Sequence, residues 1–303
     1  MRARLPLIIL LCVALLVGAC SRAPEPQGPK YGTRPSEAAV TSYRFAIHPL
    51  HNPKKLAEAY QPLIAYLNRN TPRGHFELEA SRDYQAFEDK LRKRQPDFLL
   101  PNPWQTLQAI DAGYGVVAMA GDAEDFKGIF IIRKDSGIKT PADLKGKTVA
   151  YPSPTALAAC LLPQYFLHRH GVDINRDITN VYVGSQESAI MNAYLRQAAA
   201  GATWPQPWRI FQSEHPEEAA QLQVIWETEN MQNNSVMIRN DVPAPIAQQV
   251  TELLLGLHKT AEGRSILEGM AIRAFYPADD ASYRPLARFI DAFEREVRPV
   301  VQR

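Results

Sequence analysis

Cysteine is scarce in this 303-residue chain: three are present, and two of them, Cys12 and Cys20, lie in the first twenty residues. The rest of the chain therefore holds one thiol, Cys160. A single thiol cannot form an internal disulfide. Two interpretations of Cys160 remain open. It is either a small buried hydrophobic residue or a thiol beside a binding cleft, where the start of a helix would lower its pKa.

An excess of either charge is also absent. The chain has 34 basic and 32 acidic residues, and the numbers become equal once Arg2 and Arg4 are removed with the leader described below. No basic stripe runs through the sequence, so nucleic acid is not an expected partner.

The sequence lacks the common catalytic motifs. It contains no Gly-x-Ser-x-Gly, no phosphate-binding loop and no His-Glu-x-x-His. His48 and His51 flank Pro49, but no Cys, Asp or Glu stands at metal-ligand spacing from them. We therefore expect no enzyme activity, no cofactor and no metal.

A single long apolar run, at 5–17, follows Arg2 and Arg4 and precedes the small residues of "VGAC". This layout is typical of a secretory signal, and the run is too short to span a membrane. "VGAC" resembles the lipobox of bacterial lipoproteins, which implies a signal peptide at 1–19 and an acylated Cys20 that anchors the protein. The alternative is an ordinary signal in which Cys20 occurs by chance. Ser21 resembles the outer-membrane signal of lipoproteins.

Residues 20–42 are rich in Pro, Gly and Ser and are predicted to be a flexible tether. From 42 to 113, strand-like and helix-like patterns alternate three times, which indicates a parallel sheet covered by helices. A strong strand at 128–138 leaves this unit, a second α/β unit follows, and a strand at 233–243 returns to the first. The fold class is therefore α/β.

Four stretches, in this order, resemble the phosphonate-, phosphite- and phosphate-binding proteins of ABC importers. The stretches are AEAYQPLIAYLNRN, DYQAFEDKLRKRQPDFLLPNP, IIRKDSGIKTPADLKGKTVAYPSPTALAACLLPQYFL and VIWETENMQNNSVMIRNDVP. The resemblance implies the two-lobed periplasmic binding protein fold, in which each lobe is a mainly parallel sheet flanked by helices. Two crossing strands, near 128–132 and 233–238, would form the hinge. The lobes would comprise 43–128 with 236–303, and 129–235.

The same resemblance implies a periplasmic protein that closes on a small polar or anionic ligand and delivers it to an ABC permease. The lipobox adds the membrane anchor, and we expect a monomer. An alternative within the same fold is a sensor that signals to a membrane kinase or cyclase.

One turn departs from the family pattern. Phosphonate-binding members carry a Ser-Thr-Ser-Gly run whose hydroxyls hold the oxyanion, and the matching residues here are Ala156, Leu157, Ala158 and Ala159. Three hydroxyl ligands are missing, although the backbone amides of a helix start would still supply partial positive charge. We therefore expect phosphate and simple alkylphosphonates to bind poorly. The ligand should carry less charge, or an organic part that stacks on tryptophan.

Residues at other positions of the resemblance complete the predicted site. Tyr84 matches a pocket tyrosine of the family, and Gln186 stands where the family often has histidine. Trp204 and Trp208 belong to a segment similar to the Trp-x-Pro-Trp of sulfonate- and nitrate-type relatives, and we expect them in a loop. Trp104, Trp204 and Trp208 could instead be core residues, and Gln186 could be an exposed cap. The predicted ligand-binding set is Tyr84, Asn102, Trp104, Thr155, Ala156, Leu157, Gln186 and Trp204, with Cys160 as a candidate cleft thiol.

Overall fold

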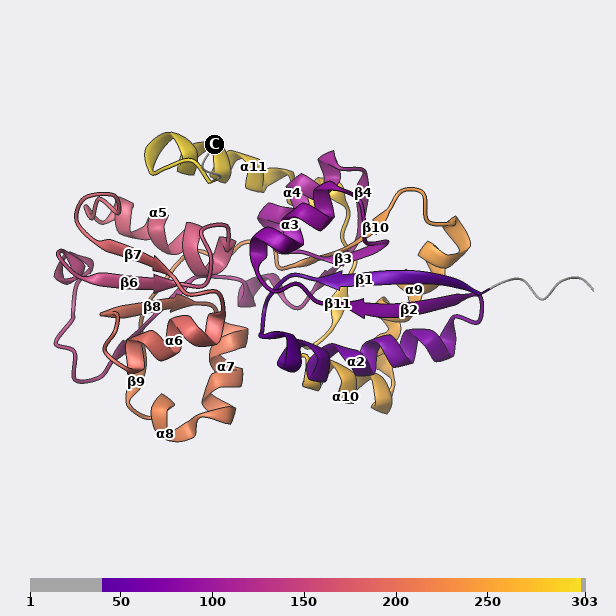
Figure 1. Ribbon diagram of the computed structural model, residues 1–303, viewed down its shortest axis with the longest axis horizontal. Helices are drawn as coiled ribbons and strands as arrows, with labels where there is room; N and C mark the ends of the chain where they lie inside the picture. The colour runs from indigo at the N-terminus through magenta and orange to yellow at the C-terminus, as the bar shows by residue number, and fades with distance from the viewer. Residues whose placement is uncertain (1–39, 301–303) are drawn as a thin grey trace, which may run out of the picture. The chain divides into compact units, whose positions relative to one another are not determined.

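The computed structural model describes residues 40–300 and builds them around two β-sheets (Figure 1). The first sheet has six strands in the order β11-β4-β10-β3-β1-β2, and the second has five in the order β7-β6-β8-β5-β9. The first sheet comprises β1 (Thr41–Ile47), β2 (Gly74–Glu79), β3 (Phe98–Leu100), β4 (Tyr114–Ala120), β10 (Ser235–Arg239) and β11 (Phe275–Tyr276). The second comprises β5 (Ile129–Arg133), β6 (Thr148–Tyr151), β7 (Thr179–Tyr182), β8 (Ala200–Thr203) and β9 (Leu222–Glu227).

Helices pack around each sheet, and we call each sheet with its helices a lobe (Figure 1). The first lobe has α2 (Pro53–Asn70), α3 (Tyr84–Arg92), α4 (Pro103–Asp111), α9 (Ala244–Gly256), α10 (Ala261–Gly269) and the start of α11 (Asp280–Glu296). The second has α5 (Leu162–Arg169), α6 (Gln186–Tyr194), α7 (Pro205–Glu214) and α8 (Pro216–Ala219). Short helical turns are η1 (Ala123–Asp125), η2 (Pro141–Leu144), η3 (Leu157–Leu161), which is a π-helix, and η4 (Leu257–Lys259).

Local sequence explains where the helices near the cleft begin. The side chain of Asp83 accepts a hydrogen bond from the amide of Ala86 and so caps α3, while Asn102 caps α4 by accepting from the amide of Gln105. Both caps satisfy amides that have no partner inside the helix. The helix α2 presents one apolar face to the first sheet, with buried residues at helical spacing: Leu56, Tyr60, Leu63, Ile64 and Leu67.

Both sheets are mixed rather than mainly parallel. β1 runs parallel to β2 and β3, and β6 runs parallel to β7 and β8. β10 is antiparallel to both of its neighbours, β3 and β4, and β5 is antiparallel to both of its neighbours, β8 and β9. The prediction of two α/β lobes is confirmed. Its description of the sheets is corrected, because the strand that follows each crossing enters its sheet in the opposite direction.

The chain passes between the sheets twice, from β4 to β5 and from β9 to β10. The two passages, 121–128 and 228–234, hydrogen-bond to each other: the Met231 amide donates to the Phe126 carbonyl (2.9 Å), and Asn233 Nδ2 donates to the Asp122 carbonyl (2.9 Å). Each passage lies just before the strand that the sequence predicted as a hinge. A paired, two-segment connection of this kind is suited to hinge motion.

The C-terminal segment contacts both lobes (Figure 1). Near its start, Asp280 Oδ1 accepts a hydrogen bond from the amide of Val116 in β4 (2.8 Å). Beyond its end, Arg298 donates to Gln164 Oε1 and to the Pro154 carbonyl, both at 2.8 Å and both in the second lobe. The lobe boundaries predicted from the sequence stay a prediction. The predicted signal peptide, Cys20 and almost all of the predicted tether lie outside the described residues.

The segment 200–214 differs from its predicted structure. The sequence suggested a loop holding Trp204 and Trp208, but β8 occupies the middle of the second sheet and α7 begins at Pro205. Proline is favoured in the first helical turn, where its missing N–H costs nothing. The strand was missed because "AGAT" has only small residues, and α6 packs closely over them.

In residues 40–300, no helix has the length and apolar character that crossing a bilayer requires.

Candidate functional site

A small cavity lies between the two lobes, at the carboxyl ends of parallel strands. Ligands of open α/β sheets bind at such ends. The cavity has a volume of about 10 Å³ in which the centre of a water molecule can lie, and this is enough for about one water. The residues that line it come from both lobes and both passages: His48, Tyr84, Asn102, Phe126, Ala156, Leu157, Ala158, Ala159, Gln186, Trp204 and Asn234.

Buried hydrogen bonds join the lobes across this cavity. Asn102 Nδ2 donates to the carbonyl of Thr155 (3.2 Å), and Thr155 Oγ1 donates to Glu88 Oε1 (2.7 Å). Gln186 Nε2 donates to the Tyr84 hydroxyl (3.3 Å). Because these bonds connect groups of opposite lobes, the lobes must part to admit a solute.

Six of the eight predicted ligand-binding residues line the cavity; the two exceptions are Trp104 and Thr155. Trp104 is buried in the core of the first lobe, and Thr155 lies just behind the cavity wall in its bond with Glu88. Gln186 is not an exposed cap, since Ser185 caps α6 and the side-chain Oε1 of Gln186 accepts a hydrogen bond from Thr203 Oγ1 (2.9 Å). That these residues bind a ligand stays a prediction.

Trp208 and Cys160 are core residues and do not line the cavity. Trp208 stacks on Phe211 within α7, with ring centroids 5.8 Å apart, and packs on the second sheet. Cys160 is fully buried and does not line the cavity; its Sγ lies 3.6 Å from Arg298 Nη2. Burial raises the pKa of this thiol to about 12, and Arg298 offsets only part of the increase. The proposed cleft thiol is therefore corrected to a core residue, because its side chain points into the lobe.

The turn after β6 leads into the π-helix η3, with Ala156 at its N-cap and Leu161 donating back to the Ala156 carbonyl (3.1 Å). The first amides of a helix have no carbonyl partner within it. No described residue outside the helix accepts from the amides of Leu157, Ala158 or Ala159. These amides remain available as donors beside the cavity, and none of residues 156–159 adds a side-chain hydroxyl.

His48 is a cavity residue that the sequence analysis considered only as a metal ligand. It follows β1, and its Nδ1 lies 2.9 Å from the Leu100 carbonyl. Burial lowers the pKa of His48 to about 4, although the Leu100 carbonyl acts to raise it. The ring is therefore neutral near pH 7. Because a carbonyl only accepts, Nδ1 carries the proton and Nε2 is an acceptor.

Asn234 is the second residue that the sequence reading missed. It ends the returning passage and is 3% exposed, yet its Oδ1 has no hydrogen-bond partner within the described structure. Its neighbour Asn233 is fully bonded, through Nδ2 to the Asp122 carbonyl and through Oδ1 to the Asn234 amide (2.8 Å). The sequence offered one signal for these two residues: His48 stands at the end of a predicted strand, and Asn234 lies within the predicted crossing strand near 233–238.

Glu88 is a buried carboxyl behind the cavity wall, 3% exposed, that also accepts from Gln105 Nε2 (3.1 Å). Burial raises the pKa of Glu88, against the lowering effect of its bonds from Thr155 and Gln105. No lysine or arginine lines the cavity within residues 40–300. In the same part of the chain, no three His, Cys, Asp or Glu side chains gather in a way that could hold a metal.

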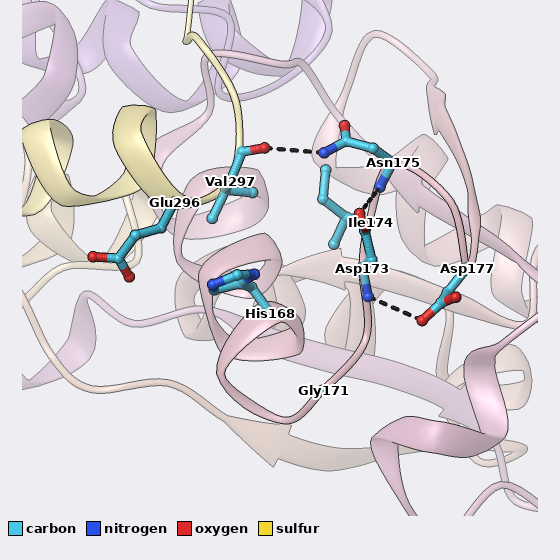
Figure 2. A pocket seen from close by; sticks show the side chains of 8 residues that line it. All are labelled: His168, Gly171, Asp173, Ile174, Asn175, Asp177, Glu296 and Val297. Atoms are coloured by element: carbon cyan, nitrogen blue, oxygen red, sulfur yellow. Dashed lines mark hydrogen bonds between the residues drawn. The ribbon is translucent and has the colours of Figure 1, made fainter.

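A larger hollow of about 330 Å³ lies away from this cavity, where the end of α11 meets the loop after α5 (Figure 2). Asn175 Nδ2 donates to the Val297 carbonyl (3.0 Å), and the Asp173 amide donates to Asp177 Oδ2 (3.0 Å). Figure 2 shows these bonds running along the loop and to the C-terminal segment. The hollow is thus where the C-terminal segment is tied to the second lobe, and we assign it no ligand.

An ionic cluster joins the lobes at the surface. Lys55 of α2 lies 2.8 Å from Glu187 Oε2 and 2.5 Å from Glu214 Oε2, which belong to α6 and α7. Burial acts to lower the pKa of Lys55, but its bonds to Glu187 and Glu214 outweigh this and raise it. Burial acts to raise the pKa of Glu187, but its hydrogen bond and ion pair with Lys55 have the larger effect, so the pKa is lowered. The stabilisation is thus lost as the pH rises through the pKa of Lys55 or falls through that of Glu187.

We predict that Lys55→Met lets the lobes separate more often, because methionine keeps the aliphatic stem and loses both ion pairs. Small-angle scattering should give a larger radius of gyration for the variant, and added salt should shift the parent protein in the same direction. Lys54→Met is the matched control, since within residues 40–300 Lys54 pairs only with Glu58 of its own helix. Equal scattering from both variants would show that the cluster does not hold the lobes together.

Comparison with known proteins relates this geometry to a family. The family described as ABC transporter, phosphonate, periplasmic substrate-binding protein matches residues 45–283. The phosphate-import protein PhnD of Mycolicibacterium smegmatis is 24% identical over 299 residues, which is 90% of each chain.

Solved structures share the fold at lower identity. A binding protein component of an ABC phosphonate transporter from Pseudomonas aeruginosa has a TM-score of 0.77 at 18% identity, covering 85% of this chain and 88% of that one. PhnD1 from Prochlorococcus marinus in complex with methylphosphonate has a TM-score of 0.78 at 18% identity, covering 84% and 99%.

Proposed function

Because the chain belongs to the family of periplasmic substrate-binding proteins of phosphonate ABC transporters, we propose that it captures a small polar or anionic ligand between its lobes and delivers it to an ABC permease. The observation that carries the proposal is the interlobe cavity, to which both lobes and both passages contribute residues. Groups from opposite lobes already hydrogen-bond there, so a ligand that replaces those bonds would favour the closed form.

A thermal-shift series tests this function. The probes are phosphonates, phosphite, phosphate, sulfonates and amino acids, each at millimolar concentration. A ligand at a hundred times its dissociation constant stabilises the native state by ~2.7 kcal/mol. We expect at least one class to raise the melting temperature, and Gln186→Ala to reduce that rise. If no class raises it, the protein is not a solute-binding protein for these compounds.

The named relatives are a phosphate-import protein and a binding protein component of an ABC transporter, which does not favour the alternative of a sensor for a kinase or cyclase. We further propose that the protein acts as a monomer and that no nucleic acid takes part.

Membrane anchoring through Cys20 is also a proposal, supported by the "VGAC" sequence at the end of the apolar leader. We predict that Cys20→Ser moves the protein from the membrane fraction to the soluble periplasmic fraction, because a protein without the acyl chains loses ~0.8 kcal/mol for each buried methylene. Fractionation with immunoblotting measures this. Cys12→Ser is the control and should leave the fractionation unchanged. Retention of the Cys20→Ser protein in membranes would contradict the anchor. Density-gradient separation of the two membranes would test the outer-membrane location suggested by Ser21.

A further inference from the structure

The polar groups that the cavity offers a ligand include acceptors as well as donors. On the donor side, the amides of Leu157, Ala158 and Ala159 begin a helical run that continues through α5. On the acceptor side is Nε2 of His48, which has no hydrogen-bond partner within residues 40–300, since the Leu100 carbonyl occupies Nδ1. A fully ionised oxyanion presents only acceptors, and an acceptor facing His48 Nε2 would be repelled.

The carboxamide of Asn234 is the second independent observation. A buried polar atom without a partner costs about 1–3 kcal/mol, and such groups are rare in native proteins. Asn234 Oδ1 is one of these atoms, and it belongs to a residue that lines the cavity. Asn233, next in the chain, shows that the same passage can satisfy an asparagine fully. The unpaired Oδ1 is therefore accounted for if the ligand donates a hydrogen bond to it.

Resting on the proposed function, we propose that the cavity selects a small oxoacid in its singly protonated form. The remaining O–H of the acid donates to His48 Nε2. The helix-start amides hold its charged oxygens, and Asn234 Oδ1 accepts a second, shared hydrogen bond from the same O–H. The absence of lysine and arginine among the described cavity residues agrees with a ligand that carries one negative charge rather than two.

The titratable groups that surround His48 do not change their charge in the pH range in which the ligand loses its proton. His51, beside Lys55, has its pKa lowered to about 4, chiefly by burial, as His48 does. The Tyr84 ring meets the His48 ring edge-on, with centroids 6.0 Å apart. Burial raises the pKa of the Tyr84 hydroxyl and that of the buried Cys160 thiol. The side chains of His48, His51, Tyr84 and Cys160 are therefore uncharged from about pH 5.5 to 8.5.

Glu88 is the remaining carboxyl at the wall, with Arg92 and Asp89 beside it on α3. Burial raises its pKa, so the experiment has to separate protonation of Glu88 from protonation of the ligand. Glu88→Gln keeps the acceptor oxygen for Thr155 and removes the titration.

The experiment compares methylphosphonate with methanesulfonate by calorimetry. At about pH 5.5 both carry one negative charge and nearly the same shape, but only methylphosphonate keeps an O–H; at about pH 8.5 it has mostly lost that proton. We expect methylphosphonate to bind at least tenfold more tightly than methanesulfonate at the lower pH, and to lose this advantage at the higher pH. A titration on the protein would change both affinities together, and Glu88→Gln should leave the ratio unchanged.

Variants of the acceptor residues complete the test. His48→Leu should abolish the tenfold advantage at about pH 5.5. Asn234→Leu should weaken methylphosphonate binding at least tenfold and raise the melting temperature of the unliganded protein by about 2–4 °C, because leucine removes the unpaired amide. Asn233→Leu should lower the melting temperature of the unliganded protein, because it removes both hydrogen bonds of the Asn233 side chain.

Several results would overturn the proposal. These are equal affinities at about pH 5.5, an advantage of methylphosphonate that grows with pH, or a loss of stability in Asn234→Leu. If neither compound binds at about pH 5.5, the oxoacid assignment is wrong, while the thermal-shift series still decides separately whether the protein binds a solute.

Discussion

Gly201→Ala, which adds one methyl group to the single glycine in the strands of the second sheet, is expected to destabilise the protein strongly. A Cβ on Gly201 would lie 2.1 Å from the carbonyl oxygen of Ala189 and 2.8 Å from its carbonyl carbon. Both are backbone atoms of α6, which packs on β8. No side chain can turn away to make room, so the whole helix must move. Overpacking of this kind costs about 1–3 kcal/mol and occasionally more, and we expect the upper end.

Thermal or urea unfolding measures the loss, and about 3 kcal/mol corresponds to a fall in melting temperature of roughly 6–12 °C for a protein of this size. Gly256→Ala is the control. It lies at the end of α9 with helical φ and ψ of −85° and −10°, and nothing comes within 4 Å of the added Cβ. Alanine is favoured over glycine in a helix by about 0.5–1 kcal/mol, so this variant should be slightly more stable. Similar unfolding curves for the two variants would refute the close packing of α6 on β8.

The displacement should also reach the cavity. Gln186 is the first residue of α6, and it holds both Tyr84 across the cavity and Thr203 of β8. A shift of α6 would separate Gln186 from at least one of these partners. Folded Gly201→Ala protein should therefore bind any ligand found in the thermal-shift series more weakly than Gly256→Ala protein does.

Gly201 also shows where sequence reasoning succeeds and where it fails for this fold. Helices such as α2 were predictable because their apolar residues repeat at helical spacing and an asparagine and a proline mark the start. β8 was not, since its small residues carry neither an alternating pattern nor bulk. They are required by the approach of a helix that is distant in sequence, and only the tertiary structure reveals that approach.

Some residues of the candidate site could likewise be predicted from the sequence, and others could not. Tyr84, Gln186 and the turn at 156–157 were found through motifs of a resembling family, and the structure places them at one cavity. His48 lies outside the four resembling stretches, and Asn234 lies in the fourth of them but was not singled out there. They are distinguished by burial without a full set of hydrogen bonds, which depends on neighbours that the sequence does not identify. Trp104 and Cys160 take the core interpretation that the sequence had left open, because proximity along the chain to cavity residues did not bring their side chains into the cavity.

The direction of a side chain is equally hard to read from sequence in the helix that follows β6. Ala156, Leu157, Ala158 and Ala159 line the cavity, whereas Cys160, the next residue, packs inside the lobe against Arg298. A π-helix advances differently from an α-helix, so the spacing rules used for amphipathic helices did not predict which residue would turn inward. The thiol consequently became a core residue, and the alanines remain the residues that set what this turn can bind.

The largest change in ligand affinity is expected when hydroxyls are restored at this turn. In the triple variant Ala156→Ser, Leu157→Thr, Ala158→Ser, three donors would stand beside the helix-start amides at the cavity. A hydrogen bond to a charged group contributes ~1.5–3 kcal/mol, and ~1.4 kcal/mol is tenfold in affinity. Even if the new hydroxyls are imperfectly placed, we expect methylphosphonate at about pH 8.5 to bind at least a hundredfold more tightly than to the parent protein, because added donors favour the doubly charged form.

Calorimetry of methylphosphonate against the parent, the triple variant and an Ala193→Ser control checks this expectation. Ala193 is buried in α6 and lies outside the cavity, so its hydroxyl should leave the affinity unchanged. Hydroxyls without partners in the unliganded triple variant should lower its melting temperature, and methylphosphonate should restore it more than it stabilises the parent. If the triple variant binds no better than the parent, hydroxyls at 156–158 do not limit oxyanion binding. The charge preference of the cavity would then rest with His48 and Asn234 on its opposite wall.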